Sequence, residues 1–521
     1  MNWLFGLVAL IALGWLVRLR LDPRRLLEPR PASRMLTATA DTALGRLLGP
    51  LTGQHPGLSG VHILDEAREA FAARMVLIRA AGRSLDLQYY IWHPDVSGML
   101  LLDAVREAAD RGVRVRLLLD DNGTGGLDAI MAALDTHPNI EVRLFNPFVL
   151  RWPKGAGYLV DFSRLNRRMH NKSLTADSLV TIVGGRNIGD EYLGASQKDL
   201  FADLDVLAIG AIVPEVSKDF DRYWACDSAY SARHILKAAG PDALAEFAAA
   251  VAAKREQPLA GGYAKAVRDT MVERLLAGTQ VLEWAQVTLV SDDPAKGLGD
   301  VRRGGLLATR LAAVTGAPQR ELGLVSAYFV PTEAGVAVFA DMAAAGVKID
   351  ILTNALKAND VAMVHAGYAP SRVPLLQAGV RLWELKGADP DRRARLRFRG
   401  GSASGARGKK GPVFRSSGSA LHAKTFTIDR ERLFVGSFNF DPRSLHLNTE
   451  MGFVIESPLL AGRLQDLFGA ELTATAYSVR LADDGLEWVE GERVHRREPG
   501  TGLVQRGVLR VLSRLPVKWL L

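Results

Sequence analysis

The stretch that decides the fold reads MHNKSLTAD at residues 169–177 and continues as TIVGGRN at 181–187. The same pattern returns as HAKTFTID at 422–429, followed by LFVGSFN at 433–439. In both copies a lysine follows the histidine by two residues, an aspartate follows it by seven, and an asparagine ends a second apolar run. A single H-x-K match has little weight, but two matches in register, each with the same second element, predict a duplicated unit.

The sequence around these two segments repeats as well. Apolar alternation and helical periodicity predict the same order of elements in both halves. Strands are expected at 85–91, 113–119, 142–145, 206–209, 323–330, 347–352 and 380–383, and helices at 67–81, 99–110, 306–314 and 336–345. The phrases RGVRV (111–115) and AGVKI (345–349) make the duplication visible. The pattern predicts an α/β fold of two repeated α/β sandwich domains, with pseudo-twofold symmetry and one shared active site.

The N-terminal residues are the most apolar part of the chain. Residues 3–17 carry no charge, and four arginines follow between residues 18 and 25. A cleaved signal peptide would carry its cations before the apolar run, so we interpret residues 1–25 as an uncleaved membrane anchor. The positive-inside rule then places the main body in the cytoplasm. A cleaved secretory signal is the alternative, and residues 26–59 are interpreted as a linker along the bilayer surface.

At 521 residues the chain is too long for a single core, so several domains are expected. We assign residues 60–235 and 281–521 to the two repeated domains and residues 236–280 to a helical connection. Residues 387–420 hold nine Lys or Arg among Gly and Ser and have no counterpart in the first half. This basic insert is interpreted as a contact with anionic lipid, with a solvated loop as the alternative.

The net charge limits the possible partners only in part, and the cysteine count limits the possible disulfides. The net charge of +8 favours anionic lipid headgroups or nucleic acid without choosing between them. The single cysteine, Cys226, excludes an intrachain disulfide and is interpreted as a small buried thiol. The oligomeric state and the need for a helper protein are left open by the sequence.

The two repeated segments carry the groups that phosphodiester chemistry needs. A phosphodiester is an anion, so a site that attacks it requires cations, a nucleophile and an acid for the leaving oxygen. Two histidines can divide the last two roles near neutral pH. The candidates are His170 and His422 for attack and protonation, Lys172 and Lys424 for the non-bridging oxygens, and Asn187, Ser437 and Asn439 for further hydrogen bonds.

Carboxylates are expected to support the histidines. An attacking imidazole needs an acceptor at its other ring nitrogen, and Asp203 and Glu450, each just before a hydrophobic strand, are the candidates. Asp177 and Asp429 complete the catalytic segments and fall at the turn that they are expected to hold. No metal is expected, because a lysine stands beside each histidine, and no cofactor is expected, because no nucleotide-binding fingerprint stands out.

The paired segments resemble the phospholipase D superfamily, whose hallmark is two H-x-K-x4-D motifs that form one site. The phrases LQYYIW (87–92), LLLDDN (117–122), RRMHNK (167–172) and GGRNIGD (184–190) are similar to bacterial cardiolipin synthases of the C type. The resemblance implies a metal-independent, two-step phosphatidyl transfer through a phosphohistidine. It implies His170 as nucleophile, His422 as general acid, the lysines and asparagines as phosphate ligands, and Asp203 and Glu450 as orienting residues.

We therefore expect a membrane-bound cardiolipin synthase-like phosphatidyltransferase. The donor would be phosphatidylglycerol or phosphatidylethanolamine, and the acceptor would be phosphatidylglycerol. A hydrolytic phospholipase D would use the same residues with water as the acceptor. A nuclease of the superfamily would have little use for the apolar N-terminus, which makes nucleic acid the less favoured partner. A non-catalytic membrane scaffold would need neither His/Lys pair.

Overall fold

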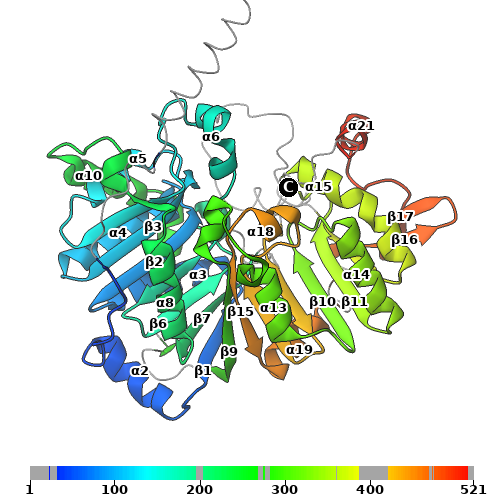
Figure 1. Cartoon of the computed structure of the whole chain (residues 1–521), viewed down its shortest axis with the longest axis horizontal. Coiled ribbons are helices and arrows are strands. Elements are labelled where there is room, and N and C mark those ends of the chain that lie inside the picture. The colour runs from blue at the N-terminus through cyan, green and yellow to red at the C-terminus, as the bar shows by residue number, and fades with distance from the viewer. Residues whose placement is uncertain are drawn as a thin grey trace, which may run out of the picture. The chain divides into compact units, whose positions relative to one another are not determined.

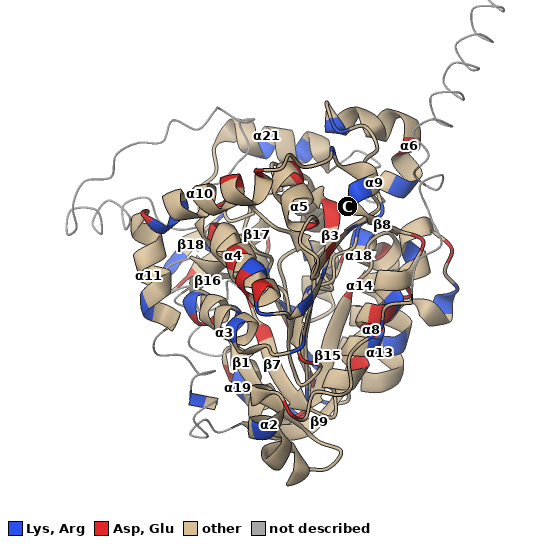
Figure 2. Ribbon diagram, turned by 90° about the vertical axis from the view of Figure 1, so that its left-hand side faces the viewer, with Lys and Arg blue, Asp and Glu red and all other residues tan. Residues whose placement is uncertain are grey.

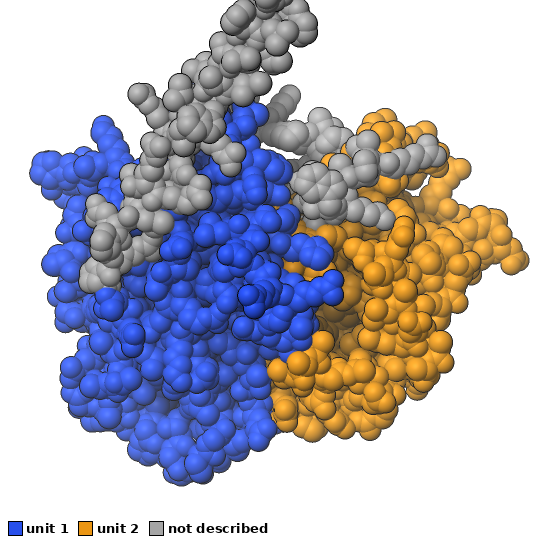
Figure 3. Space-filling view, in the orientation of Figure 1, with its two compact units in different colours: residues 1–197, 205–311, 446–453 blue, residues 198–204, 312–445, 454–521 orange. Residues whose placement is uncertain are grey.

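The computed structural model describes residues 23, 32–194, 203–267, 274–275, 282–359, 361–386, 421–468, 472 and 475–513. The chain divides into two compact units, which Figure 3 colours separately. Unit 1 comprises residues 1–197, 205–311 and 446–453, and unit 2 comprises residues 198–204, 312–445 and 454–521. Each unit therefore combines most of one half of the sequence with a short segment from the other half.

Unit 1 is built on a mixed sheet with the strand order β9–β1–β7–β6–β5–β2–β3–β4–β8 (Figure 1). Its strands are β1 (Ser59–Leu64), β2 (Ser84–Ile91), β3 (Arg114–Gly123), β4 (Ile140–Phe145), β5 (Ser173–Ala176), β6 (Val180–Gly184), β7 (Asp205–Gly210), β8 (Ala229–Ser231) and β9 (Glu283–Ser291). Strands β2, β3 and β4 run parallel, and the other neighbouring pairs in this order are antiparallel.

Helices cover both faces of this sheet because its central strands are apolar on both sides. On β3, Leu117 and Leu119 join the large core of the unit, whereas Leu118 between them packs with Phe220 and Trp224 of helix α8. The helices of the large core, which are labelled in Figure 2, are α3 (Ala67–Ala80), α4 (Val96–Asp110), α5 (Asp128–Leu134), α10 (Ala243–Arg255) and α11 (Pro258–Val267). Helix α8 (Val213–Ala225) lies on the other face, and the short helices are α6 (Tyr158–Leu165), α7 (Asp190–Leu193) and α9 (Ala232–Ile235).

The folded body begins earlier, and unit 1 extends further, than the sequence pattern indicated. Part of the expected linker 26–59 forms helix α2 (Ala43–Gly53), whose Leu44 and Leu48 are buried in the core of unit 1. The expected connection 236–280 is helical where it is described, but Phe247 and Val251 pack into the same core. Because β9 pairs with β1, unit 1 continues to Leu311 instead of ending near residue 280.

Unit 2 repeats the sheet of unit 1 with the order β14–β13–β10–β11–β12–β16–β17–β18. Its strands are β10 (Glu321–Ser326), β11 (Lys348–Asn354), β12 (Arg381–Leu385), β13 (Lys424–Ile428), β14 (Arg432–Gly436), β16 (Ala476–Ala482), β17 (Gly485–Glu490) and β18 (Arg493–His495), while β15 (Met451–Glu456) spans a unit boundary. The first six match β6–β5–β2–β3–β4–β8 in order and direction. The structure thus confirms the predicted duplication of the α/β fold.

The sheet of unit 2 is also packed on both faces. On β10, Leu322 and Leu324 join a core that contains Phe339 of helix α14, whereas a Cβ at Gly323 between them would meet Gln465 and Phe468 at the end of helix α19. The helices of unit 2 are α14 (Glu333–Ala344), α15 (Ala362–Tyr368), α16 (Arg372–Gln377), α19 (Pro458–Asp466) and α21 (Leu503–Leu512), while α13 (Leu307–Thr315) and α18 (Pro442–His446) each cross a unit boundary.

Two glycines end the equivalent helices α4 and α14. Gly112 and Gly346 both adopt φ of +91°, a left-handed conformation that glycine reaches at little cost. Each glycine directly precedes a buried valine that leads into a parallel strand. The predicted helix ends at these glycines are confirmed.

Two sequence predictions lie outside the described residues. The N-terminal anchor falls on residues 1–25, of which Pro23 alone is described, and the basic insert 387–420 is not described. Within the described parts of the chain, none of the helices has the length and apolar character that a membrane span requires.

Candidate active site

The first histidine segment enters the sheet of unit 1 directly before β5. The backbone N–H of His170 donates to the carbonyl of Thr449 at 2.8 Å, and the N–H of Thr449 donates to the carbonyl of Arg168 at 2.9 Å. Segment 446–453 therefore holds the backbone on both sides of Met169. Lys172, two residues on, donates from Nζ to the carbonyl of His170 at 2.6 Å.

The carboxylate that orients His170 comes from this same segment. Nδ1 of His170 lies 2.8 Å from Oε2 of Glu450, and both side chains are buried. A carboxylate at Nδ1 fixes the tautomer and the ring plane, so chemistry by this imidazole must take place at Nε2. The predicted orienting role of Glu450 therefore has the required geometry, and the structure assigns it to His170.

The second histidine segment, in unit 2, has the same arrangement with a different carboxylate. Nδ1 of His422 lies 2.6 Å from Oδ2 of Asp203, and Nζ of Lys424 lies 3.1 Å from the same ring nitrogen. Asp203 is buried, and it belongs to unit 2. The carboxylate that follows the first histidine segment in the sequence thus orients the histidine of the second, and the carboxylate that follows the second orients the first.

In each unit, a polar side chain at the end of the central parallel strand accepts a hydrogen bond from the backbone of the histidine segment. In unit 1, Oδ2 of Asp120 accepts a hydrogen bond from the N–H of Met169 at 2.7 Å. In unit 2, Oδ1 of Asn354, at the equivalent position of β11, accepts one from the N–H of Leu421 at 2.9 Å. Met169 and Leu421 each directly precede the histidine, so Asp120 and Asn354 fix the backbone position from which each imidazole extends.

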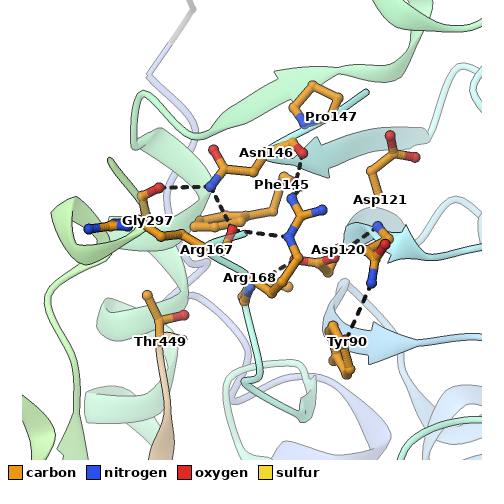
Figure 4. Close-up of polar contacts among 12 residues, drawn as sticks. Tyr90, Asp120, Asp121, Phe145, Asn146, Pro147, Arg167, Arg168, Gly297 and Thr449 are labelled. Atoms are coloured by element: carbon orange, nitrogen blue, oxygen red, sulfur yellow. Dashed lines mark hydrogen bonds and ion pairs between the residues drawn. The ribbon is translucent and has the colours of Figure 1, made fainter. Parts of the chain in front are cut away.

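Asp120 is fully buried, which disfavours the ionised form of its carboxyl group. Burial raises the pKa of Asp120 to about 6, although the nearby Arg168 guanidinium and the backbone hydrogen bonds from Met169 and Asn122 favour its ionised form. Arg168 is itself buried, with Nε 3.4 Å from Oδ2 of Asp120 and Nη2 donating to the carbonyl of Phe145 at 3.3 Å. Figure 4 shows Arg168 between Asp120 and the loop after β4, where it joins the β3 and β4 ends to the histidine segment.

The aspartates that complete the two motifs bond to backbone rather than to the histidines or lysines in any contact described. Asp177 accepts hydrogen bonds from the N–H groups of Gly82, Arg83 and Ser84, at the start of β2. Asp429 accepts equivalent bonds from residues 319–321, at the start of β10. Both lie in turns with positive φ, at 53° and 55°. Each aspartate thus ties its turn to the neighbouring strand, in line with the expected turn-holding role, and a part of either aspartate in catalysis stays a prediction.

The predicted phosphate ligands lie on the loops after β6 and β14. Oδ1 of Asn187 accepts from the N–H of Ile91 at 3.2 Å, and its Nδ2 is buried without a hydrogen-bond partner among the described residues. Ser437 and Asn439 are buried on the corresponding loop of unit 2. A buried amide N–H₂ that lacks an acceptor is costly unless a ligand supplies one, so Asn187 fits the role of a phosphate donor.

Tyr90 is a neighbour of His170 that the sequence reasoning missed. The Tyr90 ring stands edge-on to the His170 ring, with centroids 5.0 Å apart, and Nζ of Lys172 lies 5.6 Å from the Tyr90 centroid. Alternation along β2 was a usable signal, because the buried Leu87 and Tyr89 belong to the large core and place Tyr90 on the opposite face.

Asp292 is a second residue that was missed, and it fixes the backbone of Glu450. Its own N–H donates to the Glu450 carbonyl at 3.0 Å, and its Oδ2 accepts from the Glu450 N–H at 2.9 Å. Burial raises the pKa of Asp292 to about 6, against the opposing effect of Lys296, whose Nζ lies 2.9 Å from the carboxylate. No sequence motif marks Asp292, since its role depends on the pairing of β9 and the 446–453 segment.

Each unit thus contains a histidine whose Nδ1 faces a buried carboxylate, with a lysine two residues further on. An imidazole held this way can attack phosphorus or exchange a proton from Nε2, and the lysine brings positive charge to a phosphate. The pair of sites is equipped for acid–base and nucleophilic chemistry at an anionic ester.

Comparison with known proteins identifies the relatives of this chain. A family model described as "Cardiolipin synthase, PLD-like domain" matches residues 75–224 and 314–472. Cardiolipin synthase C of Escherichia coli (strain K12) is 49% identical over 478 residues, which cover 91% of this chain and 98% of that protein. A cardiolipin synthase of Geobacillus kaustophilus is 27% identical, covering 81% of this chain and 69% of that protein.

A solved structure supports the fold independently of close sequence similarity. The crystal structure of a phosphatidylserine synthase from Haemophilus influenzae superposes with a TM-score of 0.58 at 14% identity, covering 91% of this chain and 99% of that one. The likeness extends over nearly the whole length of both chains. The likeness therefore supports the fold. The family model, which matches more than half of the chain, and the 49% identical relative show that this chain belongs to the cardiolipin synthase family of phospholipase D-like proteins.

Proposed function

We propose that this chain is a phosphatidyltransferase that makes cardiolipin by moving a phosphatidyl group to the hydroxyl of phosphatidylglycerol through a phosphohistidine. The observation that carries the proposal is that both H-x-K histidines present Nδ1 to a buried carboxylate, at 2.8 Å and 2.6 Å. Such pairing is needed for an imidazole that must attack through Nε2 or pass a proton there.

In the first step, Nε2 of His170 attacks the phosphorus of the donor lipid. The bond from phosphorus to the headgroup oxygen breaks, and His422 gives that oxygen a proton, which leaves the phosphatidyl group on His170. In the second step, His422 takes the proton of the acceptor hydroxyl, whose oxygen attacks phosphorus and releases His170. The carboxylates stabilise the cationic imidazoles in both steps, and Glu450 acts on the proposed nucleophile.

The charge that develops on the phosphoryl oxygens needs donors. Lys172 and Lys424 supply positive charge, and Asn187, Ser437 and Asn439 supply hydrogen bonds. The buried Nδ2 of Asn187, which has no acceptor within the described residues, supports this assignment most directly. Tyr90 packs against both His170 and Lys172 and limits how far either side chain can turn.

The donor is either phosphatidylglycerol or phosphatidylethanolamine, and the reaction takes place at the bacterial inner membrane with the body on its cytoplasmic side. The apolar residues 3–17 and the arginines that follow support this location by sequence alone. Hydrolysis would use the same histidines with water in the second step. The two reactions therefore differ in the acceptor and must be separated by their products.

The test is the lipid content of cells that lack their own cardiolipin synthases and express this chain or its variants. His170→Ala and His422→Ala should each abolish cardiolipin, whereas His495→Ala, which truncates a partly exposed histidine on β18, should not. Donors labelled in the headgroup then distinguish the two candidate substrates. Phosphatidic acid in place of cardiolipin would identify a hydrolase, and cardiolipin from both histidine variants would refute the mechanism.

A further inference from the structure

Helix α21 (Leu503–Leu512) in unit 2 exposes an apolar face. Leu503, Val504 and Val511 are 76%, 78% and 62% exposed, which ranks them among the most exposed large apolar side chains in the described parts of the chain. A helix turns about 100° per residue, so these three and Gly507 fall within an arc of about 100°. Leu509, on the opposite side, is buried where α21 packs near α15.

The helix is fastened to the body of unit 2 through the segment that precedes it. Glu498 accepts a hydrogen bond from Nη1 of Arg372 at 2.7 Å and lies 3.0 Å from Nε2 of His365 on α15. All three side chains are largely buried, and Arg372 also bonds to Glu384 on β12 at 2.7 Å. The orientation of the apolar face is therefore set by the fold.

The charges of this part of the chain match an anionic surface. Residues 503–521 read LVQRGVLRVLSRLPVKWLL, with four cationic residues and no acidic residue. In the described part, Arg506 and Arg510 fall on one flank of the apolar arc, and Arg510 is exposed. A second copy of this chain would bring the same cations together with no acid on either helix, so self-association through this face is disfavoured.

We propose that α21 is a membrane-docking helix that lies in the interface of an anionic bilayer, with Leu503, Val504 and Val511 among the acyl chains and Arg510 at the headgroups. A helix with one apolar face, a cationic flank and no acidic residue has the character of a helix that lies in the bilayer plane. The inference deepens the proposed function, because a lipid-modifying site must be brought to the bilayer that holds its substrate. It rests on that function only for the role of the docking, since binding to the bilayer does not require catalysis.

The test reads the depth of single positions, because the apolar N-terminus would bind vesicles by itself. The full chain carries Cys226→Ser and one new cysteine, in Val504→Cys, Val511→Cys or Gln505→Cys, labelled with an environment-sensitive fluorophore. Gln505 is an exposed position of α21 outside the apolar arc. The protein is reconstituted into phosphatidylcholine vesicles with phosphatidylglycerol and lipids that carry a spin label at a shallow acyl position.

Labels at 504 and 511 should shift to the blue and lose roughly half of their emission to the spin-labelled lipid, because the apolar face lies 5–10 Å deep, whereas a label at 505 should change little. Equal quenching at 504 and 505, or none at any position, would overturn the proposal. A blue shift that appears only at high protein concentration, without quenching by the spin-labelled lipid, would instead show that a second copy of the chain covers this face and would overturn the proposal.

Turnover gives an independent reading. Leu503→Asn, Val504→Asn and Val511→Asn together should lower the rate on vesicle substrate several-fold and leave the rate on detergent-dispersed substrate unchanged. Because the fluorescence readout needs no catalysis, it stands even if the proposed transferase activity fails. An equal loss of rate in vesicles and in detergent would show damage to the fold and would count against a docking role.

Discussion

The aspartates of the two motifs provide a sharp test of what the repeated segments do, because equivalent residues are bonded differently. At Asp177, Oδ1 accepts from Arg83 N at 2.7 Å and from Ser84 N at 2.9 Å, while Oδ2 alone accepts from Gly82 N at 2.9 Å. At Asp429, Oδ1 accepts from all three N–H groups of residues 319–321, at 3.2, 2.7 and 3.0 Å, and Oδ2 shares only the first of them.

An asparagine in place of the aspartate keeps one acceptor and turns the other oxygen into a donor. In Asp177→Asn the new N–H₂ faces the Gly82 N–H at a site that is 0% exposed, and an unsatisfied buried N–H costs about 1–3 kcal/mol. In Asp429→Asn the retained oxygen satisfies all three donors, and solvent reaches the partly exposed site. Both variants lose the charge, so the expected difference between them is about 2 kcal/mol.

Hydrogen exchange read by mass spectrometry measures this difference in each unit separately. A loss of about 2 kcal/mol in local stability accelerates exchange about 30-fold, and we expect this for the peptide over β2 in Asp177→Asn. The peptide over β10 in Asp429→Asn should change about threefold or less. The reasoning is refuted if the two variants accelerate exchange equally. A variant Asp177→Asn that loses turnover with unchanged exchange would instead support a direct part of this aspartate in catalysis.

Further predictions follow from the other buried carboxylates. Glu450→Gln keeps the shape beside His170 but removes the charge that stabilises its imidazolium, and should lower single-turnover transfer about 10²–10⁴-fold without unfolding the protein; near-normal transfer would contradict the assignment. Asp120→Asn introduces the residue that stands at the equivalent position of unit 2, so the variant should fold. Because burial raises the pKa of Asp120 to about 6, the wild type loses stability as the pH rises from about 4 to 6. In urea titrations the variant should lose less stability than the wild type over that range. Burial opposes the ionisation of Glu498, but His365 and Arg372 lower its pKa to about 2. The wild type should therefore exceed Glu498→Gln in free energy of unfolding by the full amount above about pH 4.5, and this difference should shrink as the pH falls toward 2. A difference that does not depend on pH would exclude the ion pair as its source.

Local patterns predicted the parts of this molecule that local interactions determine. The parallel strands β2, β3 and β4 and their counterparts are short apolar runs bounded by helices, and the helix ends at Gly112 and Gly346 are a property of glycine itself. The repeated segments predicted His and Lys on one face of a strand because alternation in an extended chain is a local rule. The boundary near residue 280 was misplaced because β9 is defined by its partner β1, which lies far away in the sequence.

The supporting residues escaped prediction for the same physical reason. Asp120 and Asn354 share a register but not a residue type, so the duplication gives no sign that both accept the N–H before the histidine. Asp292 acts through a backbone pairing with Glu450 that no side-chain pattern encodes. A buried carboxylate is tolerated only with matched donors, and those donors come from distant parts of the chain.

The pairing of carboxylates with histidines shows most clearly what a linear reading leaves out. Asp203 is closer in sequence to His170 than to His422, and proximity would pair it with the wrong imidazole. Instead, residues 198–204 belong to the unit of His422, and residues 446–453 belong to the unit of His170. Neither half of the sequence therefore contains a complete histidine–carboxylate pair: a chain ending at residue 311 would keep His170 but lose the Glu450 that fixes its tautomer. This exchange gives a physical reason for both copies of the motif to reside in one polypeptide, because each copy supplies the residue that makes the other chemically competent.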